Sequence, residues 1–302
     1  MAAPRVTLGV PVYNGSRYLA ETLDSLLAQD FADFELIISD NASTDDTPRI
    51  CAAYAARDRR VRCVRNDRNL GAAGNYNRLV LLARGRYFKW ASADDVCGRS
   101  LVARCVEVLD SHPEVVLAYP KTVMIDERGQ PIRDHEDRLH MRQPEPWKRL
   151  EHFARNRWLC NPCFGLIRTD VLRRTRLVRP NPHSDISLLG ELTIAGEFYE
   201  VPERLFFRRV TATSCGLGKL TEQEVAAWFE PDRRQRRLID PRRLVFLQIE
   251  HSIVTAPMPV LHRVRCMWTY WRATKKKMIP ASGSHAVHET LPAAPPAPTS
   301  SR

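Results

Sequence analysis

Four short apolar segments in the first 90 residues of this chain alternate with segments of helical periodicity. The apolar segments are Val6–Val12, Phe34–Ser39, Val61–Val64 and Tyr87–Trp90. Short apolar runs bounded by turn residues are typical of strands that are buried on both faces. Strands that alternate with helices form parallel crossovers. The sequence therefore predicts an α/β fold with a mostly parallel central sheet and helices on both faces.

The helices between these strands are indicated by the leucine pattern and by residues that begin helices. The first predicted helix begins at Ser16, and leucines at helical spacing give it one buried stripe: Leu19, Leu23, Leu26 and Leu27. Ser43 and Asp46 have the character of a capping box, which predicts a second helix that runs to about Arg57. A third helix is expected after residues 69–71, with apolar positions at Leu79, Leu81 and Leu82.

The chain keeps this character until about residue 230. Further helices are expected over about 99–111, 145–157 and 186–195, and further strands over 115–119, 122–125, 164–168, 198–201 and 205–207, with a hairpin turn at 127–130. The composition changes at Pro231, where basic runs begin, and the end of the chain is rich in Pro, Ala and Ser. We expect a core domain over 1–230, a basic helical extension over 231–279 and a disordered tail over 280–302.

The chain has a formal net charge of +11, from 46 Lys and Arg against 35 Asp and Glu. Such an excess attracts polyanions, nucleotide phosphates or anionic lipid surfaces, and it does not choose among them. No aromatic and basic motif of recognisable spacing accompanies the charge, so nucleic acid is not an expected partner. No apolar run reaches the ~18–20 residues that are needed to cross a bilayer.

The extension contains an apolar and basic segment that allows two interpretations. It comprises residues 244–247 together with Trp268, Tyr270, Trp271 and Lys275–Lys277. The segment either lies on an anionic membrane surface, where lipid-linked acceptors are found, or forms helices that pack on the core domain.

Eight cysteines are scattered along the predicted strands and helices: Cys51, Cys63, Cys97, Cys105, Cys160, Cys163, Cys215 and Cys266. The chain enters its first strand at once, with no signal peptide. These observations predict a reduced, cytoplasmic protein with buried thiols. Cys160 and Cys163 form a single C-x-x-C, and the second pair of ligands that a structural zinc site needs is missing from the sequence.

Two adjacent carboxylates, Asp94 and Asp95, follow the apolar segment that ends at Trp90. Adjacent carboxylates repel each other, and burial adds to the cost unless a cation compensates. Mg²⁺ or Mn²⁺ suits this role, because hard cations bind carboxylate oxygens together with substrate phosphates. The alternative is a helix N-terminus, where Asp is also favoured. Asp40 ends the second strand, and we expect it to reach the same edge of the sheet as the acidic pair.

The first strand-to-helix turn, over residues 11–16, is neither G-x-G-x-x-G nor a Walker loop. A diphosphate is therefore not cradled by glycine backbone here, and a metal on Asp94 and Asp95 would have to neutralise it. This turn argues against dehydrogenases and P-loop enzymes.

Four motifs in order resemble the inverting family 2 glycosyltransferases. They are Val10–Gly15, Ile38–Asp45, Asn69–Gly71 and Ala93–Asp95. Their order and spacing agree with the family over about residues 5–130, and the similarity weakens towards about 215. The resemblance implies a GT-A fold and a nucleotide-diphosphate sugar as donor.

The resemblance also implies roles for individual residues. The base pocket would be lined by Pro11, Tyr13 and Asn14, and Asp40 would bind the nucleoside. Asp94 and Asp95 would form the D-x-D-type motif, in which Asp94 contacts both metal and nucleotide sugar and Asp95 is the stronger candidate for direct metal contact. Ser92 stands where many relatives carry a further Asp, which leaves the geometry of the sugar and metal contacts open.

Three further side chains near the donor side have two interpretations each. Asn75 and Asn77 either face the donor cleft, where Asn75 would bind the nucleotide sugar, or cap a turn. Trp90 either stacks on a sugar or base or is a core aromatic beneath the site.

The family places a catalytic base in the acceptor half near a helix start, and Asp185 is the best match. Inversion needs a carboxylate that removes the proton of the acceptor hydroxyl while its oxygen attacks the anomeric carbon opposite the leaving nucleotide. The alternative role of Asp185 is N-capping, and Glu191 is the fallback base. Some relatives carry a His after the last core strand, whereas this chain has Arg208 and Arg209, which either contact the diphosphate or lie on the surface.

The sequence thus predicts a metal-dependent, inverting glycosyltransferase that works in the cytoplasm or at the inner face of a membrane. Its hydroxyl acceptor would be a polysaccharide, a glycolipid or a small glycoside. Two alternatives stay open. A sugar nucleotidylyltransferase would need a Gly-rich, Arg-containing loop, which residues 9–17 do not supply. A catalytically degenerate domain that binds a nucleotide sugar or a partner is kept open by Ser92 and the missing His.

Overall fold

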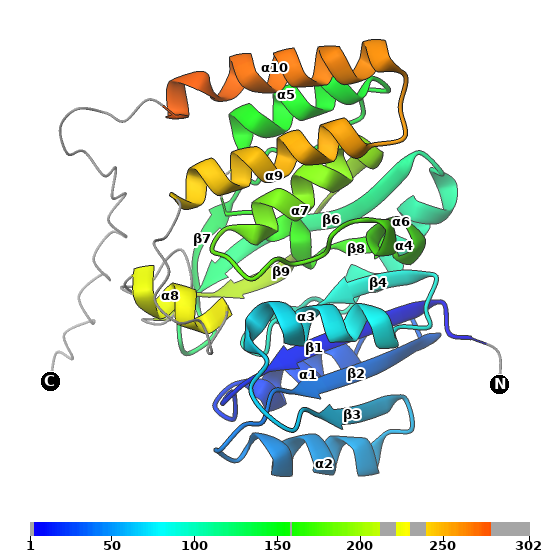
Figure 1. The fold of residues 1–302 in the computed structure, drawn as a ribbon. Helices are drawn as coiled ribbons and strands as arrows, with labels where there is room; N and C mark the ends of the chain where they lie inside the picture. The colour runs from blue at the N-terminus through cyan, green and yellow to red at the C-terminus, as the bar shows by residue number, and fades with distance from the viewer. Residues whose placement is uncertain (1–2, 158, 212–221, 230–239, 279–302) are drawn as a thin grey trace, which may run out of the picture.

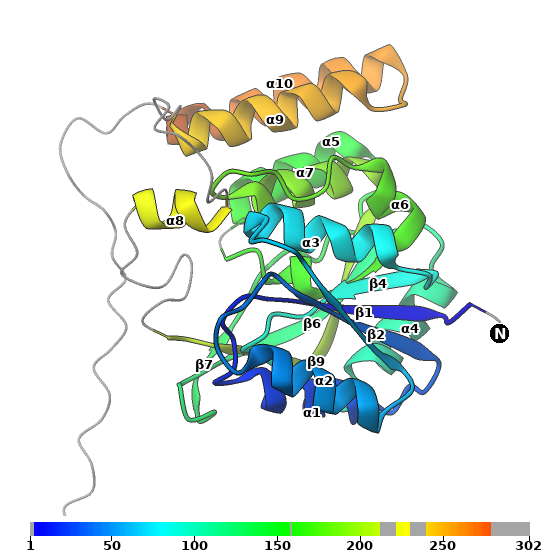
Figure 2. The ribbon, with the colours of Figure 1, turned by 60° about the horizontal axis from the view of Figure 1, so that its bottom comes forward.

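The computed structural model describes residues 3–157, 159–211, 222–229 and 240–278. Within these residues, nine strands form one sheet in the order β3-β2-β1-β4-β8-β6-β9-β5, and β7 pairs with β6 beside this path. Helices lie on both faces of the sheet (Figures 1 and 2). The α/β prediction is therefore confirmed.

The first half of the sheet consists of four parallel strands: β3 (Val61–Arg65), β2 (Phe34–Asp40), β1 (Val6–Val12) and β4 (Tyr87–Trp90). Strands β1 and β2 are buried along their whole length, which explains their nearly continuous apolar sequences. Helices α1 (Leu19–Leu27) and α2 (Thr47–Arg57) cover one face, and α3 (Gly71–Leu82) covers the other (Figure 2). Because the strands are parallel, their carboxyl ends share one edge of the sheet.

The second half of the sheet is mixed. Strand β8 (Leu166–Arg168) lies antiparallel between β4 and β6 (Val115–Ile125), and β6 runs parallel to β9 (Glu197–Arg209). Two short strands, β5 (Val96–Cys97) and β7 (Pro131–His135), pair antiparallel with β9 and β6. The helices of this half are α4 (Leu101–Ser111), α5 (Pro146–Asn156), α6 (Thr169–Arg174) and α7 (Ser184–Ala195), and a 3₁₀ turn spans Asn161–Phe164.

Two predicted pairs of strands are each one continuous strand. Residues 115–119 and 122–125 both belong to β6, and 198–201 and 205–207 both belong to β9. The pairing of β6 with β9 shifts register at Pro120 and Lys121, where the proline has no N–H to donate. This irregularity accounts for the break in the sequence pattern without ending the strand.

The predicted capping box at Ser43 and Asp46 is wrong. The Ser43 hydroxyl accepts the Asn14 N–H instead, and Asp46 makes no side-chain cap to α2. Asp45 takes this position, because its two carboxylate oxygens accept the N–H groups of Thr47 and Ser16. The bond to Ser16 holds the turn before α1, which begins at Leu19 rather than at Ser16. The predicted stripe of α3 is also only partly buried, since Leu81 is 72% exposed.

In the described part of the chain after β9, there are three helices: α8 (Glu222–Phe229), α9 (Pro241–Thr255) and α10 (Val260–Met278). Helix α9 packs on α7, and α10 packs on α5 (Figure 1). A methyl group added at Gly190 of α7 would lie 2.7 Å from Ile249 Cδ1 of α9, so glycine permits this close approach. The predicted C-terminal helices are therefore present, and they pack on the core.

The boundaries predicted at 230 and 280 stay predictions, because residues 230–239 and 279–302 lie outside the described residues. The basic run 233–237 falls in the first of these gaps, and Cys215 lies in a separate one, residues 212–221. In the part of the chain that is described, no helix is both long and apolar enough to cross a bilayer.

Candidate active site

The loops that follow β1, β2 and β4 meet at the carboxyl edge of the sheet. Strand β1 lies between the other two, with Val12 opposite Asp40 on β2 and Gly9 opposite Trp90 on β4. The Asn41 N–H donates to Val12 O, and an added methyl at Gly15 would lie 3.5 Å from Ala93 Cβ. The ends of β2 and β4 are two strand spacings apart, or about 10 Å. Asp40 and the acidic pair thus occupy one edge, as the sequence predicts.

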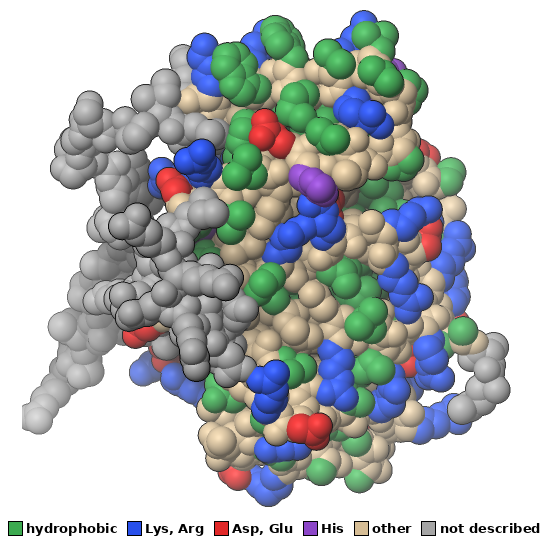
Figure 3. Space-filling model, viewed as in Figure 1, with side chains coloured by type: hydrophobic (Ala, Val, Ile, Leu, Met, Phe, Trp, Pro, Cys, Tyr) green, Lys and Arg blue, Asp and Glu red, His purple; other side chains and the backbone are tan. Residues whose placement is uncertain are grey.

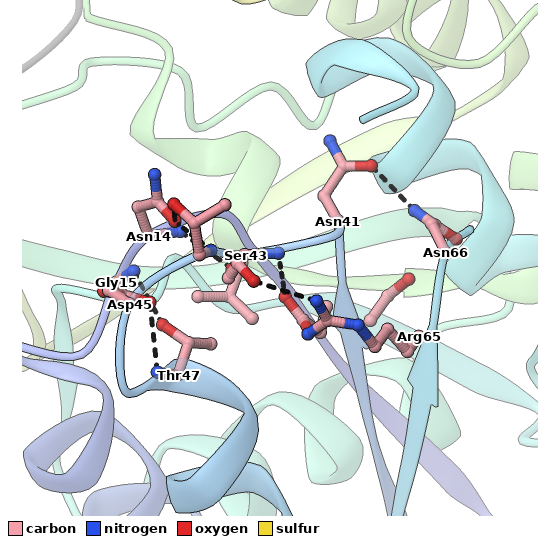
Figure 4. Close-up of polar contacts among 12 residues, drawn as sticks. Asn14, Gly15, Asn41, Ser43, Asp45, Thr47, Arg65 and Asn66 are labelled. Carbon is pink, nitrogen blue, oxygen red and sulfur yellow. Dashed lines mark hydrogen bonds and ion pairs between the residues drawn. The ribbon is translucent and has the colours of Figure 1, made fainter. Parts of the chain in front are cut away.

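Asp40 is buried at the end of β2, and its carboxylate already has two protein partners, Ser43 and Arg65, which Figure 4 labels. One oxygen accepts the Ser43 N–H at 3.0 Å, and the other pairs with the Arg65 guanidinium. Arg65 also donates to Ser43 O at 2.9 Å. This ion pair fixes the carboxylate while the Arg65 side chain stays half exposed. Sequence reasoning missed Arg65, although it stands at the end of the neighbouring β3.

Asn14 ties the turn after β1 to the loop after β2. Its backbone has φ 51°, in the left-handed region that Asn tolerates. Its side-chain oxygen accepts the Thr44 N–H at 2.8 Å, and the Gly15 N–H donates to Thr47 Oγ1 (Figure 4). The neighbouring Tyr13 is 45% exposed at this edge, whereas Pro11 is buried within β1. Of the three predicted base-pocket residues, Tyr13 and Asn14 are exposed and Pro11 is not.

Asn75 and Asn77 are held by the protein itself. Asn75 is buried, and its amide bonds with the Ser39 hydroxyl at 2.6 Å and with Ser39 O at 2.9 Å. Asn77 donates to Val178 O and accepts the Val178 N–H. These contacts anchor α3 to β2 and to the segment before α7. The contact of Asn75 with a nucleotide sugar stays a prediction.

The acidic pair is held among backbone and arginine contacts. Asp95 is 5% exposed, and one of its oxygens accepts the Arg209 N–H at 2.8 Å. Asp94 is partly buried and accepts the Ser92 hydroxyl. Burial and the neighbouring charge of Asp94 raise the pKa of Asp95 to about 7, against the opposing effect of Arg208. The helix N-terminus alternative does not hold, because Val96 continues into β5.

Arg209 holds the loop that carries the acidic pair. Its guanidinium is buried and donates to Asp94 O at 2.8 Å, to Asp126 O and to Glu127 O, and it pairs with Glu21 at 2.6 Å. It therefore joins β9 to α1, to the β4–β5 loop and to the β6–β7 hairpin. Of the two predicted roles for this arginine, surface exposure is excluded.

The acidic pair fits a hard divalent cation. Two carboxylates lie side by side, and the pKa of Asp95 shows that its charge is poorly compensated by the protein. Mg²⁺ and Mn²⁺ accept one or two carboxylates and complete their coordination with water and phosphate oxygens. No group of three or more His, Cys, Asp or Glu side chains that could hold a metal occurs among the described residues. The two carboxylates therefore fit a metal ion whose remaining ligands come from a substrate and from water.

Asp185 lies in the first turn of α7 and is partly buried. Its carboxylate accepts the Ile186 N–H at 2.9 Å, and the N-cap residue of the helix is His183, so simple N-capping does not describe it. Burial raises the pKa of Asp185, against the opposing effects of the Ile186 N–H, His183 and Arg208. Arg208 acts on the pKa of Asp95 in the same direction, so one guanidinium lies within electrostatic reach of both carboxylates.

Arg208 is held in this position by its own contacts. It donates to Leu159 O at 3.2 Å and to the Asn161 side chain, in the turn that α7 contacts. The fallback base Glu191 is engaged elsewhere: it pairs with Arg176 at 3.0 Å and accepts the Ser252 hydroxyl at 2.8 Å. These contacts make Glu191 a link between α7 and α9 and leave Asp185 as the candidate base.

Two residues of β4 lie directly behind the acidic pair. Trp90 is 1% exposed and donates its indole N–H to Tyr76 O, so it is the core aromatic of the two predicted roles. Lys89 is fully buried, and its ammonium donates to Trp90 O at 3.1 Å and to Phe164 O. Its charge also lowers the pKa of Asp95. The sequence analysis did not single out Lys89. A lysine inside an otherwise apolar strand was the feature that could have indicated it.

The C-x-x-C pair lies in the turn beside Arg208. Burial raises the pKa of both the Cys160 and the Cys163 thiols, which keeps them protonated. Metal binding and thiol exchange both need the thiolate. The turn is a buried part of the core, and the absence of a zinc or redox site there stays a prediction.

Comparison with known proteins identifies a family whose model matches the chain and solved structures with the same fold. The family model of glycosyl transferase family 2 matches residues 7–179, more than half of the chain. An uncharacterized glycosyltransferase of Methanocaldococcus jannaschii, MJ1057, is 25% identical over 181 residues, which are 58% of this chain and 60% of that protein. The first curated relatives are covered over 14% to 60% of their own length.

Two solved structures share the architecture of the chain. S. aureus TarS 1–349 in complex with UDP-GlcNAc has a TM-score of 0.65 at 16% identity, over 90% of this chain and 73% of that chain. Mannosyltransferase PcManGT from Pyrobaculum calidifontis, in complex with GDP-Man and Mn²⁺, has a TM-score of 0.52 at 17% identity, over 94% of this chain and 77% of that chain. These likenesses confirm the predicted GT-A fold.

Proposed function

The chain belongs to glycosyl transferase family 2, and on this basis we propose a metal-dependent, inverting transfer of a sugar from a nucleoside-diphosphate sugar to a hydroxyl acceptor. One observation carries the proposal. The charge of Arg208 lowers the pKa of both Asp95, which lies beside Asp94, and Asp185, so the proposed metal-binding pair and the proposed base lie within electrostatic reach of one guanidinium. An inverting transfer needs these two groups on opposite sides of the anomeric carbon.

The proposed donor is supported by the ligands of the two solved structures, which are UDP-GlcNAc and GDP-Man. We assign the nucleoside to the Asp40 side of the edge, where the Arg65 ion pair fixes the carboxylate and Tyr13 exposes its ring. We assign the diphosphate to the Asp94 and Asp95 side. Pro11, Asn14 and Asn75 would shape the proposed donor site through the strand and loop contacts that they make.

The chemistry follows from what each group can do. Bound Mg²⁺ or Mn²⁺ would neutralise the diphosphate as negative charge develops on it. Asp94 and Asp95 would hold that ion, and Arg208 adds a fixed positive charge next to them. Asp185 would take the proton from the acceptor hydroxyl. Its raised pKa suits this role, since a base works best when its pKa lies near the operating pH.

The acceptor that we propose is a hydroxyl group on a polysaccharide, a glycolipid or a small glycoside. We place the reaction in a reduced compartment, at the inner face of a membrane when the acceptor is lipid-linked. The described cysteines support this location, because all seven are free thiols and five of them are buried.

A donor screen with and without Mn²⁺ tests the proposal. We expect metal-dependent turnover of one class of UDP-, GDP- or dTDP-sugar. Asp95→Asn should abolish this turnover and leave the circular dichroism spectrum unchanged. Asp170→Asn is the matched control, because Asp170 lies exposed on α6 with a surface partner, Arg174. Metal-independent turnover, or full activity of Asp95→Asn, would refute the metal site. Donor binding without any turnover or transfer would favour the degenerate domain.

A further inference from the structure

Among the described residues, helices α9 and α10 carry most of the large apolar side chains that are exposed. Seven of the twelve large hydrophobic residues that are exposed in the described chain lie on these two helices: Leu247, Val254, Val260, Leu261, Val264, Trp268 and Trp271. Their exposed fractions run from 45% to 70%. In the space-filling view, hydrophobic and basic side chains lie next to one another over this end of the molecule (Figure 3). A concentration of this kind marks an interaction surface.

The apolar side chains of α10 form one continuous stripe. At 100° per residue, positions 260, 261, 264, 268 and 271 fall within an arc of about 100°. The opposite side of the helix is buried, with Cys266 and Tyr270 fully inside the core. Part of the segment therefore packs on the core, as one of the two interpretations predicts: Tyr270, Val245 and Phe246 are core residues, whereas Leu247, Trp268 and Trp271 are exposed.

The stripe is bordered by positive charge. Helix α10 contains six Lys and Arg residues and no Asp or Glu. The Arg272 guanidinium lies 4.7 Å from the centre of the Trp268 ring, and the Lys275 ammonium lies 5.2 Å from the centre of the Trp271 ring. Both exposed tryptophans of α10 thus carry a cation. Arg272 also pairs with Glu151 of α5, at 3.2 Å, on the flank of the stripe.

We propose that the outer face of α9 and α10 docks on the surface of a membrane that contains anionic lipid, with α10 lying in the plane of the interface. Tryptophans prefer this interface, where the apolar ring is buried and the cations meet lipid phosphates. The inference rests on the proposed function only for its purpose, which is to bring the active site to a lipid-linked acceptor. Docking itself requires no particular donor.

The charge of the face distinguishes this occupant from a second copy of the chain. A self-association surface would bring two α10 helices together, each with six basic residues and no acidic residue. Like charges placed close together are repulsive, and only an acidic surface relieves this. An anionic membrane provides negative charge and an apolar layer together, which matches both halves of the pattern.

The test is co-sedimentation of the full chain with vesicles. We expect binding to phosphatidylcholine vesicles that contain about 30% phosphatidylglycerol, weaker binding at high salt, and little binding to phosphatidylcholine alone. The double variant Trp268→Ala/Trp271→Ala should lose at least about tenfold in affinity, in keeping with the area that two tryptophans bury. Trp228→Ala is the matched control, because Trp228 is 44% exposed on α8, which packs on α3, and its ring lies against Tyr76.

The inference fails if the full chain does not bind anionic vesicles, or if the double variant binds them as tightly as the unmodified chain does. A concentration-dependent dimer that the double variant abolishes would assign the face to a second copy instead. Donor hydrolysis without vesicles is measured on the same variants and should be unchanged. Vesicle binding without donor turnover would refute the proposed function alone, and turnover without vesicle binding would refute this inference alone.

Discussion

At the scale of single residues, Asp95 combines a buried carboxylate with a like-charged neighbour. The pKa of this group rises from the ordinary value of 3.8 to about 7, chiefly because of burial. The folded protein therefore binds this proton more tightly than the unfolded chain. As the pH rises from about 4 towards 7, the metal-free protein should lose stability, by at most about 4 kcal/mol from this group.

The measurement is chemical denaturation of the metal-free protein between about pH 4.5 and 8, a range that brackets the pKa of about 7. We expect the free energy of unfolding of Asp95→Asn to depend less on pH than that of the unmodified chain. Mn²⁺ should restore stability above pH 7, because the ion competes with the proton for the carboxylate. Equal pH dependence of the two proteins would show that Asp95 is already ionised at low pH.

Asp185 supports a prediction about the split between binding and chemistry. Asp185→Asn keeps the size and the oxygen that accepts the Ile186 N–H, but it removes the group that would take a proton. We expect the rate of transfer to fall about 10²- to 10⁴-fold, with donor affinity within about twofold of normal. Single-turnover transfer and donor binding by calorimetry measure the two quantities. A collapse of donor binding would instead place Asp185 on the donor side.

The sequence located the acidic residues of this edge but not the cations that hold them. Asp40, Asp94 and Asp95 each stand at the end of a strand, which is a local pattern. Arg209 pairs with Glu21, 188 positions away, and no spacing in the sequence encodes such a contact. Arg65, the partner of Asp40, could be predicted only once the strand order β3-β2-β1 was known, because that order puts the ends of β3 and β2 side by side.

At the scale of elements, strand β9 positions the acidic loop through Arg209. Its guanidinium makes hydrogen bonds in several directions at once, which the single ammonium of lysine cannot reproduce. Arg209→Lys should therefore lower the free energy of unfolding by about 2–4 kcal/mol and reduce metal-dependent donor turnover at least about tenfold. Thermal denaturation and Mn²⁺ titration of turnover measure these effects.

Arg204→Lys provides the comparison on the same strand. Arg204 is exposed and pairs with Asp134 at 2.8 Å, so its replacement should change the free energy of unfolding by less than about 1 kcal/mol. If Arg209→Lys and Arg204→Lys change the free energy of unfolding and the donor turnover equally, the Arg209 contacts contribute nothing specific to the loop that carries Asp94 and Asp95.

Most elements follow from periodicity, and the exceptions have physical causes. The parallel strands β1 to β4 are apolar runs with turn residues at each end, so their positions were predictable. Strand β5 has two residues, too few for any pattern. The insertion of β8 between β4 and β6 depends on long-range pairing, which a single sequence does not reveal. A proline inside β6 divided one strand into two predicted ones.

At the scale of the whole molecule, α9 and α10 raise the question of whether the extension is a separable unit. Six of their side chains are buried in one core cluster with residues of α5 and α7: Val245, Phe246, Ile249, Ile253, Cys266 and Tyr270. At about 1.5–3 kcal/mol for each large apolar side chain, their burial contributes on the order of 10 kcal/mol. A domain of this kind has a net stability of only about 5–15 kcal/mol.

Removal of both helices should therefore unfold the core domain, even though a shorter chain has less conformational entropy to lose. We expect a chain that ends at Asp240 to be insoluble or to lack a cooperative thermal transition, because Phe153 of α5 and Leu189 of α7 would be exposed to water. A chain that ends at Met278 is the control and should melt within about 2 °C of the full chain. Soluble, active protein from the shorter chain would show that residues 1–240 fold alone and that the extension is an independent module.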